Sequence, residues 1–226
     1  VLTMNRNEVN VLTRRSESVI STNKVLRNTY LLLSLTFLFS AFTAYLSMLS
    51  GARPNVLVML VGIYGLMFLT HALRNSVWGL VSVFAFTGFL GFTLGPILNY
   101  YLLSFANGHQ LVATALGGTG MIFFGLSGYA LTTRKDFSYL GGFLFVGIMV
   151  VLLAMIAGIF FQTPALQLMI SAAFILISSG LILFQTSEII HGGETNYISA
   201  TVGLFVSIYN LFVSLLNILG AFSGRD

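Results

Sequence analysis

Charged side chains are excluded from seven long apolar stretches of this chain, with a single exception. Of the 10 basic and 6 acidic side chains, all fall in the gaps between these stretches except Glu188, which lies inside one. A charge at the centre of a membrane helix costs from ~3 to more than ~10 kcal/mol, depending on how the cost is measured. The pattern indicates a chain surrounded by lipid, and it makes Glu188 the first residue to explain.

Composition and the length of the apolar stretches define the fold class. Charged residues make up 7% of the chain and hydrophobic residues 57%, whereas a soluble domain carries about 25% charge. Helices of about 20 apolar residues cross the hydrocarbon layer, while a membrane β-barrel would need alternating segments of about 10 residues. We therefore expect an all-α membrane protein, a bundle of seven transmembrane helices. The predicted spans cover approximately residues 28–50, 54–73, 77–98, 110–133, 139–161, 165–190 and 198–222.

Lys and Arg residues are divided unevenly between the two sides of such a bundle. Cytoplasmic gaps carry an excess of these residues, which predicts a cytoplasmic N-terminus and a periplasmic C-terminus. The larger group comprises Arg6, Arg14, Arg15, Lys24, Arg27, Arg74, Arg134 and Lys135, and the smaller group comprises Arg53 and Arg225. Orientation in the membrane also accounts for the net charge of +4. The expected surroundings are the lipid bilayer, and no nucleic-acid partner is expected.

The N-terminal residues differ in composition from the rest of the chain. Residues 1–23 are rich in Asn, Ser, Thr and charge and hold too little apolar surface to fold alone. The gaps between the later spans are too short for a soluble domain. We expect a flexible cytoplasmic tail over residues 1–23 and a transmembrane domain over residues 24–226.

Polar residues follow one face of each of the last two spans. The seventh span presents Ser199, Gly203, Ser207, Asn210, Ser214 and Asn217 at helical spacing, and the sixth presents Ser171, Ser178, Gln185 and Glu188. Such faces turn away from lipid. The strong polar groups Gln185, Glu188 and Asn210 lie towards the same ends of these spans. With Ser207, which lies on the same face as Asn210, they predict a polar intramembrane site or ion path. The alternative is that Glu188 extends to water at the helix end, beside Arg134 or Lys135.

Small residues mark the first and third spans. The first span presents Thr36, Ser40, Thr43 and Ser47, and the third presents Gly88, Gly91 and Gly95 ahead of Pro96. Small side chains let helix backbones approach closely in membranes. We expect these two faces to pack together, and the same reading applies to most Ser, Thr and Gly positions in the spans.

One motif suggests an enzyme. Gly125–Gly128 matches the GxSG of rhomboid proteases, and the spacing of His71 and Asn75 matches HxxxN, with His191 at the end of the sixth span. Serine and histidine are the minimum for nucleophilic catalysis. Ser127, however, is expected deep in the membrane and both histidines near helix ends. The chain has no cysteine and no HExxH or Walker motif, so we expect no catalytic residues, metal site or cofactor.

Several segments resemble the Bax inhibitor family of seven-span membrane proteins. The segments are STNKVLRNTY at 21–30, FAFTGFLGFTLGPILN at 84–99, LTTRKDFSYLGG at 131–142, FQTSEIIHGGETN at 184–196 and YNLFVSLLNILG at 209–220. The resemblance covers the chain from Ser21 onward. It implies a seven-helix bundle in the bacterial inner membrane with the last helix at its centre.

The resemblance also implies two alternative functions. The bacterial branch that it fits best modulates the membrane protease FtsH, which implies a non-enzymatic protein that binds the FtsH complex. Other members are pH-sensitive calcium leaks, attributed to an aspartate in each of the last two helices. Those positions correspond to Gln185 and Ser207 in this chain, so the carboxylate pair is missing. Glu188 could replace it, and flux of calcium ions would then fall in Glu188→Gln.

Overall fold

The computed structural model describes the backbone of residues 6–52 and 56–224 and the side chains of residues 24–52 and 57–224. Over these ranges the chain forms helices and no strand. The helices are α1 (Arg6–Ser50), α2 (Val56–Leu73), α3 (Trp78–Ser104), α4 (Gly108–Thr133), α5 (Leu140–Phe160), α6 (Pro164–His191) and α7 (Tyr197–Ser223). The prediction of an all-α fold with seven apolar helices is confirmed.

Local sequence signals explain where the last two helices begin and end. Pro164 opens α6 as its first residue, and the side chain of Thr163 accepts a hydrogen bond from the first turn. The side chain of Asn196 accepts from two backbone N–H groups at the start of α7. Gly192 ends α6 at a φ of +78°, a left-handed conformation that glycine adopts without strain.

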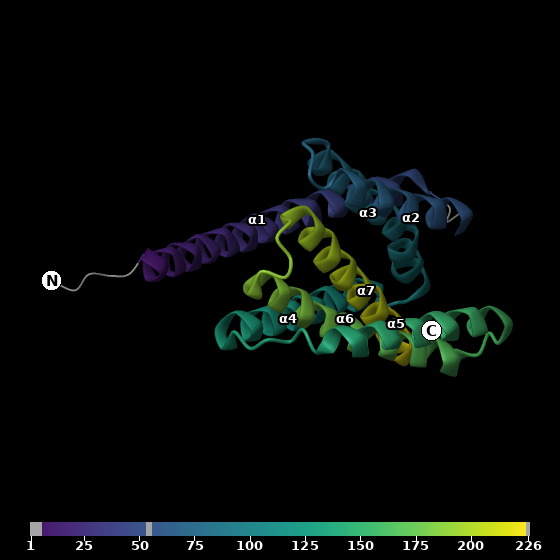
Figure 1. Cartoon of the computed structure of the whole chain (residues 1–226). Helices are drawn as coiled ribbons and strands as arrows, with labels where there is room; N and C mark the ends of the chain where they lie inside the picture. The colour runs from purple at the N-terminus through teal and green to yellow at the C-terminus, as the bar shows by residue number, and fades with distance from the viewer. Residues whose placement is uncertain (1–5, 53–55, 225–226) are drawn as a thin grey trace.

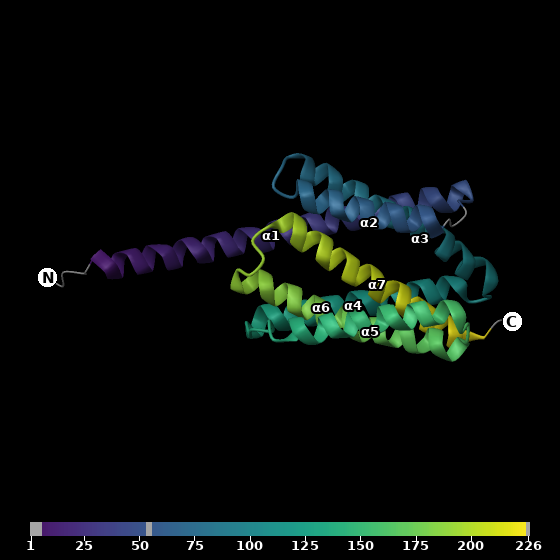
Figure 2. The same cartoon turned by 45° about the vertical axis from the view of Figure 1, so that its right-hand side comes forward.

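Six of the described helices are long and apolar enough to cross a membrane, and α2 is shorter over Leu57–Leu73. At ~1.5 Å per residue the 18 residues of α2 extend about 27 Å, slightly less than a typical hydrocarbon layer. α2 nevertheless runs alongside α3 in the opposite direction (Figure 2). The chain therefore passes along the bundle seven times.

The helices form two groups with α7 between them (Figures 1 and 2). α1, α2 and α3 lie on one side and α4, α5 and α6 on the other, and α7 packs against every helix except α5. Its buried residues Leu204, Phe205 and Leu211 meet Phe86 of α3 and Ile182 of α6 in the main hydrophobic core. The central position implied for the last helix is confirmed.

α1 and α3 pack closely through the small residues that the sequence singled out. A Cβ atom added to Gly91 would collide with the backbone carbonyl of Ser40 and with the hydroxyl of Thr43. One added to Gly95 would lie 2.5 Å from the side chain of Ser47. The predicted contact between these two faces is confirmed, and glycine is required there because the backbones leave no room for a side chain.

Helix α1 begins at Arg6, so the backbone of residues 6–23 is helical where the sequence predicts a flexible tail. This part of α1 extends beyond the other helices (Figures 1 and 2). Residues 1–5 lie outside the described residues. From Arg6 onward the backbone of this segment is helical. That residues 1–23 form a tail separate from the transmembrane domain remains a prediction.

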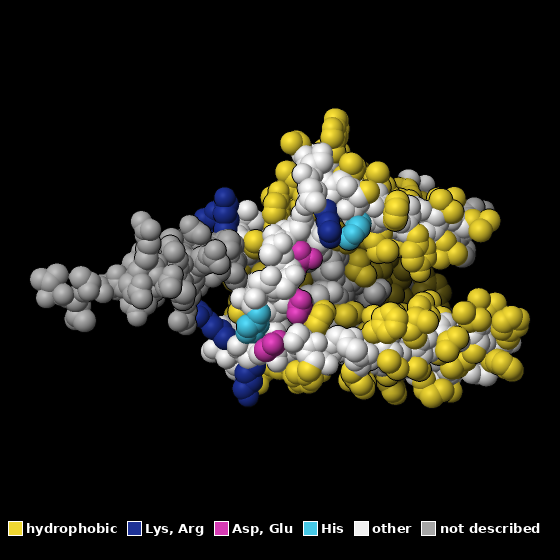
Figure 3. Space-filling model, viewed as in Figure 1, with side chains coloured by type: hydrophobic (Ala, Val, Ile, Leu, Met, Phe, Trp, Pro, Cys, Tyr) yellow, Lys and Arg dark blue, Asp and Glu magenta, His cyan; other side chains and the backbone are white. Residues whose placement is uncertain are grey.

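Charged side chains gather at one end of the described structure, where α1 leaves the bundle (Figure 3). The described charged residues are Lys24, Arg27, Arg74, Arg134, Lys135, Asp136, Glu188 and Glu194. Lys and Arg outnumber Asp and Glu in this group. By the charge rule this end faces the cytoplasm, and the orientation remains a prediction.

Candidate functional site

Gln185 and Ser207 meet between α6 and α7. The hydroxyl of Ser207 lies 3.4 Å from Oε1 of Gln185 and 3.0 Å from the carbonyl oxygen of Gly203 in its own helix. One hydroxyl hydrogen serves one strong bond, so the contact to Gln185 is the weaker of the two. Gly203 makes room for the amide, since a Cβ there would lie 3.1 Å from Nε2 of Gln185. The structure therefore places Gln185 next to Ser207, and the missing side chain at Gly203 leaves the space that the Gln185 amide occupies.

Glu188 occupies the last turn of α6 and is half-buried. Its carboxylate lies against Gly193, where a Cβ would collide with it. Its backbone carbonyl accepts the N–H groups of Gly193 and Glu194 at 2.9 and 3.2 Å, which closes the helix. Within the described residues the carboxylate has neither an ion pair nor a hydrogen bond, so the expected pairing with Arg134 or Lys135 is not seen.

Asn210 lies three residues after Ser207 on α7 and is half-buried. Among the described residues, no hydrogen bond joins its side chain to Gln185, Glu188 or Ser207. Of the four residues predicted to form a polar site, the structure joins two by a hydrogen bond. Glu188 lies one turn nearer the helix end, with its carboxylate turned towards the α6–α7 loop.

Ser187 and His191 bind the α4–α5 loop, a contact that the sequence analysis did not predict. The buried hydroxyl of Ser187 accepts the backbone N–H of Phe137 at 2.9 Å and lies 3.3 Å from the carbonyl oxygen of Lys135. Nε2 of His191 lies 3.1 Å from the carbonyl oxygen of Arg134. These bonds attach the α4–α5 loop to the end of α6. Only the presence of two hydrogen-bonding side chains one turn apart at a helix end could have indicated the contact.

The same loop contains a carboxyl group with an altered acidity. The backbone N–H of Ser138 donates to Oδ1 of Asp136 at 2.9 Å. Hydrogen bonds from the backbone and side chain of Ser138 hold the pKa of Asp136 below its usual value. The carboxylate of Asp136 thus opens the turn that leads into α5.

Asn196 connects two loops at this end of the bundle. Its side-chain amide donates to the carbonyl oxygen of Arg74 at 3.0 Å and to Oδ1 of Asn75 at 2.8 Å. Its backbone N–H donates to the carboxylate of Glu194 at 2.7 Å. The residue that caps α7 thus also fixes the α2–α3 loop, which gives Asn75 a structural contact in place of the suspected catalytic one.

The residues of the GxSG motif do not meet a histidine. Ser127 is buried, and its hydroxyl has no hydrogen-bond partner among the described residues. His71 is exposed on α2, while both ring nitrogens of His191 lie next to backbone carbonyl oxygens, one of Ser187 and one of Arg134. The serine and the two histidines therefore form no hydrogen-bonded nucleophile and base, which is the geometry a serine hydrolase needs.

Comparison with known proteins identifies the family. The profile of the family described as inhibitor of apoptosis-promoting Bax1 matches residues 22–224. The chain belongs to the Bax inhibitor family. Among curated family members, the modulator of FtsH protease YccA of Escherichia coli K12 is 63% identical over 210 residues, covering 92% of this chain and 94% of that protein. The same identity and coverage hold for the inner membrane protein YccA of Escherichia coli O6:H1.

Other members of the Bax inhibitor family match over a similar length. An uncharacterized protein of Pseudomonas aeruginosa is 59% identical over 203 residues, covering 89% of this chain and 91% of its own length. The family resemblance expected from the sequence is therefore confirmed. So is the expected location, a multi-pass protein of the bacterial inner membrane.

Proposed function

We propose that this chain is a non-enzymatic inner-membrane protein that binds and modulates the FtsH protease complex. The observation that carries the proposal is the 63% identity to the Escherichia coli modulator over 92% of the chain. Similarity of this extent covers nearly the whole chain, so the two proteins share the bundle that a membrane partner would meet. Among the described residues the hydroxyl of Ser127 has no hydrogen-bond partner, and the ring of His191 contacts backbone carbonyl oxygens, which supports a role without catalysis.

The length of α1 supports a role for the N-terminal residues in this interaction. α1 contains 45 residues, whereas about 20 residues suffice to cross a bilayer. Its N-terminal part extends beyond the other helices (Figure 2), at the end predicted to face the cytoplasm. A protease complex that meets the bundle from this side would therefore reach the N-terminal extension before it reaches the packed core.

The first experiment removes this extension. We expect deletion of residues 1–20 to change the turnover of the protein or its effect on FtsH, measured as pulse-chase half-lives of the chain and of a known FtsH substrate. The matched control carries residues 1–20 in scrambled order, which preserves length and composition. Affinity capture of the full chain from membranes in mild detergent should recover the FtsH complex.

The outcomes separate the role of the extension from the proposed function. If the shortened protein is degraded and acts like the full chain, the extension is not the contact. If capture of the full chain recovers no FtsH and the half-life of the FtsH substrate is unchanged when the chain is overproduced, the proposed function is wrong.

The alternative function, a pH-sensitive calcium leak, has weaker support in this chain. A leak controlled by two carboxylates needs acidic side chains at positions 185 and 207, and these positions hold an amide and a hydroxyl that contact one another at 3.4 Å. Neither group titrates near neutral pH. The carboxylate of Glu188 lies against Gly193 and not against this pair, so it does not supply the missing acid.

A further inference from the structure

His191 stands at the end of α6 with a carbonyl oxygen beside each of its ring nitrogens. Nδ1 lies 2.9 Å from the carbonyl oxygen of Ser187, one turn earlier in α6, and Nε2 lies 3.1 Å from the carbonyl oxygen of Arg134 in the α4–α5 loop. A carbonyl oxygen only accepts hydrogen bonds, and a neutral imidazole carries a single N–H group. Only the doubly protonated ring donates to both oxygens.

The hydroxyl of Ser187 is part of the same arrangement. Its oxygen accepts the backbone N–H of Phe137 at 2.9 Å. Its own hydrogen can reach either the carbonyl oxygen of Lys135 or Nδ1 of His191, each at 3.3 Å. The carbonyl oxygens of Ser187, Arg134 and Lys135 therefore need three hydrogens between them. The imidazolium and the hydroxyl supply three, whereas a neutral ring and the hydroxyl supply two.

Either tautomer of the neutral ring gives up a bond to the loop. With the hydrogen on Nε2, the ring still donates to Arg134, but Nδ1 becomes an acceptor that draws the hydroxyl of Ser187 away from Lys135. With the hydrogen on Nδ1, the carbonyl oxygen of Arg134 loses its donor. Loss of the proton thus weakens the attachment of the α4–α5 loop to α6 in both cases.

The bond from His191 holds a residue in an unfavourable conformation. Arg134 follows α4 at a φ of +50°, and among the described residues other than glycine it alone has a positive φ. The left-handed conformation is unfavourable for a residue with a Cβ atom, and glycine is the usual residue at such a position. The backbone N–H of Arg134 bonds to Ala130 at 2.9 Å, so His191 holds the other end of the same residue.

The ring of His191 is exposed, as is the loop that it contacts, so its protonation follows the pH of the surrounding water. The carboxylate of Asp136 interacts electrostatically with the ring. Helices α4, α5 and α7 contain no Lys, Arg, Asp or Glu. The other charged or phenolic side chains on the segments around α6 are Lys24, Arg27, Tyr129, Arg134, Lys135, Tyr139, Glu188, Glu194 and Tyr197.

Histidine is the side chain whose ordinary titration falls near neutral pH. Lys, Arg, Tyr and carboxyl groups at their ordinary values titrate outside the range from about pH 6 to about pH 8. A change in the loop within this range therefore reports on a histidine.

We propose that His191 is a proton-dependent switch, which holds the α4–α5 loop against α6 when the ring is protonated and loosens the loop when the proton leaves. The loop carries the exposed side chains of Arg134, Lys135 and Asp136 at the end predicted to face the cytoplasm. The order of this charged surface then depends on the pH at that side of the membrane. The switch acts within the chain and does not depend on the proposed binding of FtsH.

The experiment measures hydrogen exchange at the Phe137 amide of the purified full-length protein. Rates at about pH 6 and about pH 8, either side of the range in which histidine titrates, are each divided by the intrinsic rate at that pH. Nitrogen NMR of labelled histidine records the protonation of His191 across the same range. His191→Gln removes the titrating ring.

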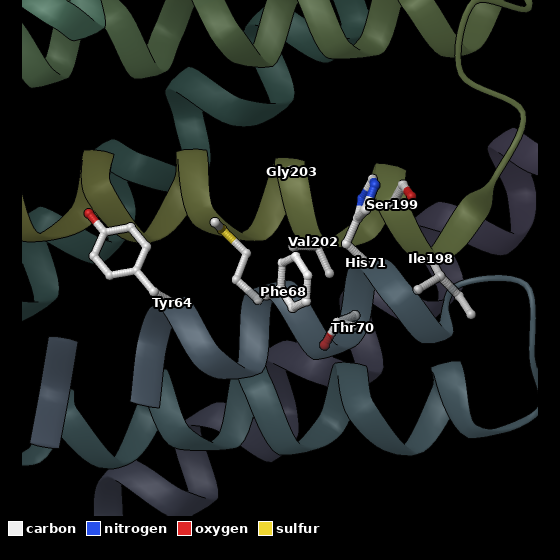
Figure 4. A pocket seen from close by; sticks show the side chains of 9 residues that line it. Tyr64, Phe68, Thr70, His71, Ile198, Ser199, Val202 and Gly203 are labelled. Atoms are coloured by element: carbon white, nitrogen blue, oxygen red, sulfur yellow. The ribbon is translucent and has the colours of Figure 1, made fainter. Parts of the chain in front are cut away.

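The two other histidines of the chain provide the controls. His71 lines a pocket of 560 Å³ between α2 and α7 (Figure 4). His109 lies in the first turn of α4, at the other end of that helix from the loop. Neither ring forms a hydrogen bond within the described part of the chain, so His71→Gln and His109→Gln remove a titrating group and leave the loop contacts in place.

We expect the Phe137 amide to be protected about two- to ten-fold more at the lower pH than at the higher one, the factor that one net hydrogen bond contributes. His191→Gln should abolish this pH dependence, and both controls should keep it. Asp136→Asn retains an oxygen that can accept the N–H of Ser138 but removes the negative charge that favours the imidazolium. It should move the midpoint of the transition to lower pH.

Three results would overturn the proposal. The first is equal protection of the Phe137 amide at both pH values in the wild type. The second is a pH dependence that survives in a folded His191→Gln. The third is a ring of His191 that stays neutral at about pH 6 by nitrogen NMR. If His191→Gln does not fold, Asp136→Asn decides, because a midpoint at lower pH supports the switch and an unchanged midpoint refutes it.

Discussion

The interface between α1 and α3 and the C-terminal end of α6 both contain polar residues, but they use them differently. At the first interface the hydroxyls of Thr36 and Thr43 donate to carbonyl oxygens of their own helix, at 2.8 and 2.9 Å. At the end of α6, Ser187 bonds to the backbone of another segment and Gln185 contacts Ser207 of another helix. Polarity alone therefore does not reveal which membrane residues join two segments.

The difference follows from the separation of the backbones. At Gly91 and Gly95 α3 lies so close to α1 that only small side chains fit between the two helices, and the hydroxyls of Thr36 and Thr43 bond to carbonyl oxygens of their own helix. The end of α6 meets a loop, whose backbone groups lack helical partners. Those groups must be paired inside a membrane protein, so the side chains of Ser187 and His191 bond to them.

The largest effect is expected from a side chain inserted at the α1–α3 interface. Gly91→Ala places a methyl group where the carbonyl of Ser40 and the hydroxyl of Thr43 already lie. Overpacking of this kind costs about 1–3 kcal/mol. Unfolding of the purified protein by sodium dodecyl sulfate, followed by circular dichroism, should show a loss of stability in that range.

The control for this substitution is Gly117→Ala, because a Cβ at Gly117 would meet nothing within 4 Å. Alanine there should be neutral or should stabilise α4 by up to ~0.8 kcal/mol, since it favours the helix. Equal destabilisation by both substitutions would mean that the cost arises from the helix itself and not from contact with α1.

An intermediate effect is expected where α6 holds the α4–α5 loop. Ser187→Ala leaves the buried N–H of Phe137 without its partner at 2.9 Å, and an unpaired buried donor costs about 1–3 kcal/mol. Partial access of water at the membrane surface should bring the loss to the lower part of this range. The same unfolding measurement applies, together with faster hydrogen exchange at the Phe137 amide.

Thr132→Ala is the control for Ser187, because the hydroxyl of Thr132 is exposed and donates only to its own helix. It should change stability by less than ~0.5 kcal/mol. A loss as large as that of Ser187→Ala would contradict the view that bonds to the loop matter more than bonds within a helix.

Much of the bundle was predictable because its signals are local. Apolar stretches define the helices, and charged gaps separate them, so the predicted spans agree with the observed ones to within a few residues in most cases. The third helix continues to Ser104, six residues past the predicted end. Asn99, Tyr100 and Tyr101 are polar enough to suggest a gap, but Asn99 donates to the carbonyl of Met48 and Tyr101 to Asn217.

The candidate site was less predictable because it depends on contacts between distant segments. The helical positions of Gln185 and Ser207 can be read from their spacing, but their contact depends on Gly203 and on how α6 crosses α7. The bond between Ser187 and Phe137 joins residues 50 positions apart. The pocket between α2 and α7 arises from the position of α2 against α3, which no periodicity within one helix specifies.

The smallest effect is expected at the contact between Gln185 and Ser207, and a comparison of two pairs can measure it. The hydroxyl of Tyr101 lies 2.6 Å from Oδ1 of Asn217, whereas the Ser207 hydroxyl lies 3.4 Å from Gln185 and has an alternative acceptor in its own helix. Interhelical hydrogen bonds in membranes contribute about 0.6 kcal/mol on average and up to about 1.7 kcal/mol.

Double-mutant cycles of Gln185→Ala with Ser207→Ala and of Tyr101→Phe with Asn217→Ala should therefore give different coupling energies. The first is expected below about 0.6 kcal/mol and the second towards 1.7 kcal/mol. If the Gln185–Ser207 pair proves the more strongly coupled, the two side chains form a tighter contact than their distance indicates. Position 185 would then hold α6 to α7 as firmly as the glycines hold α3 to α1, and the contrast between the two regions would fail.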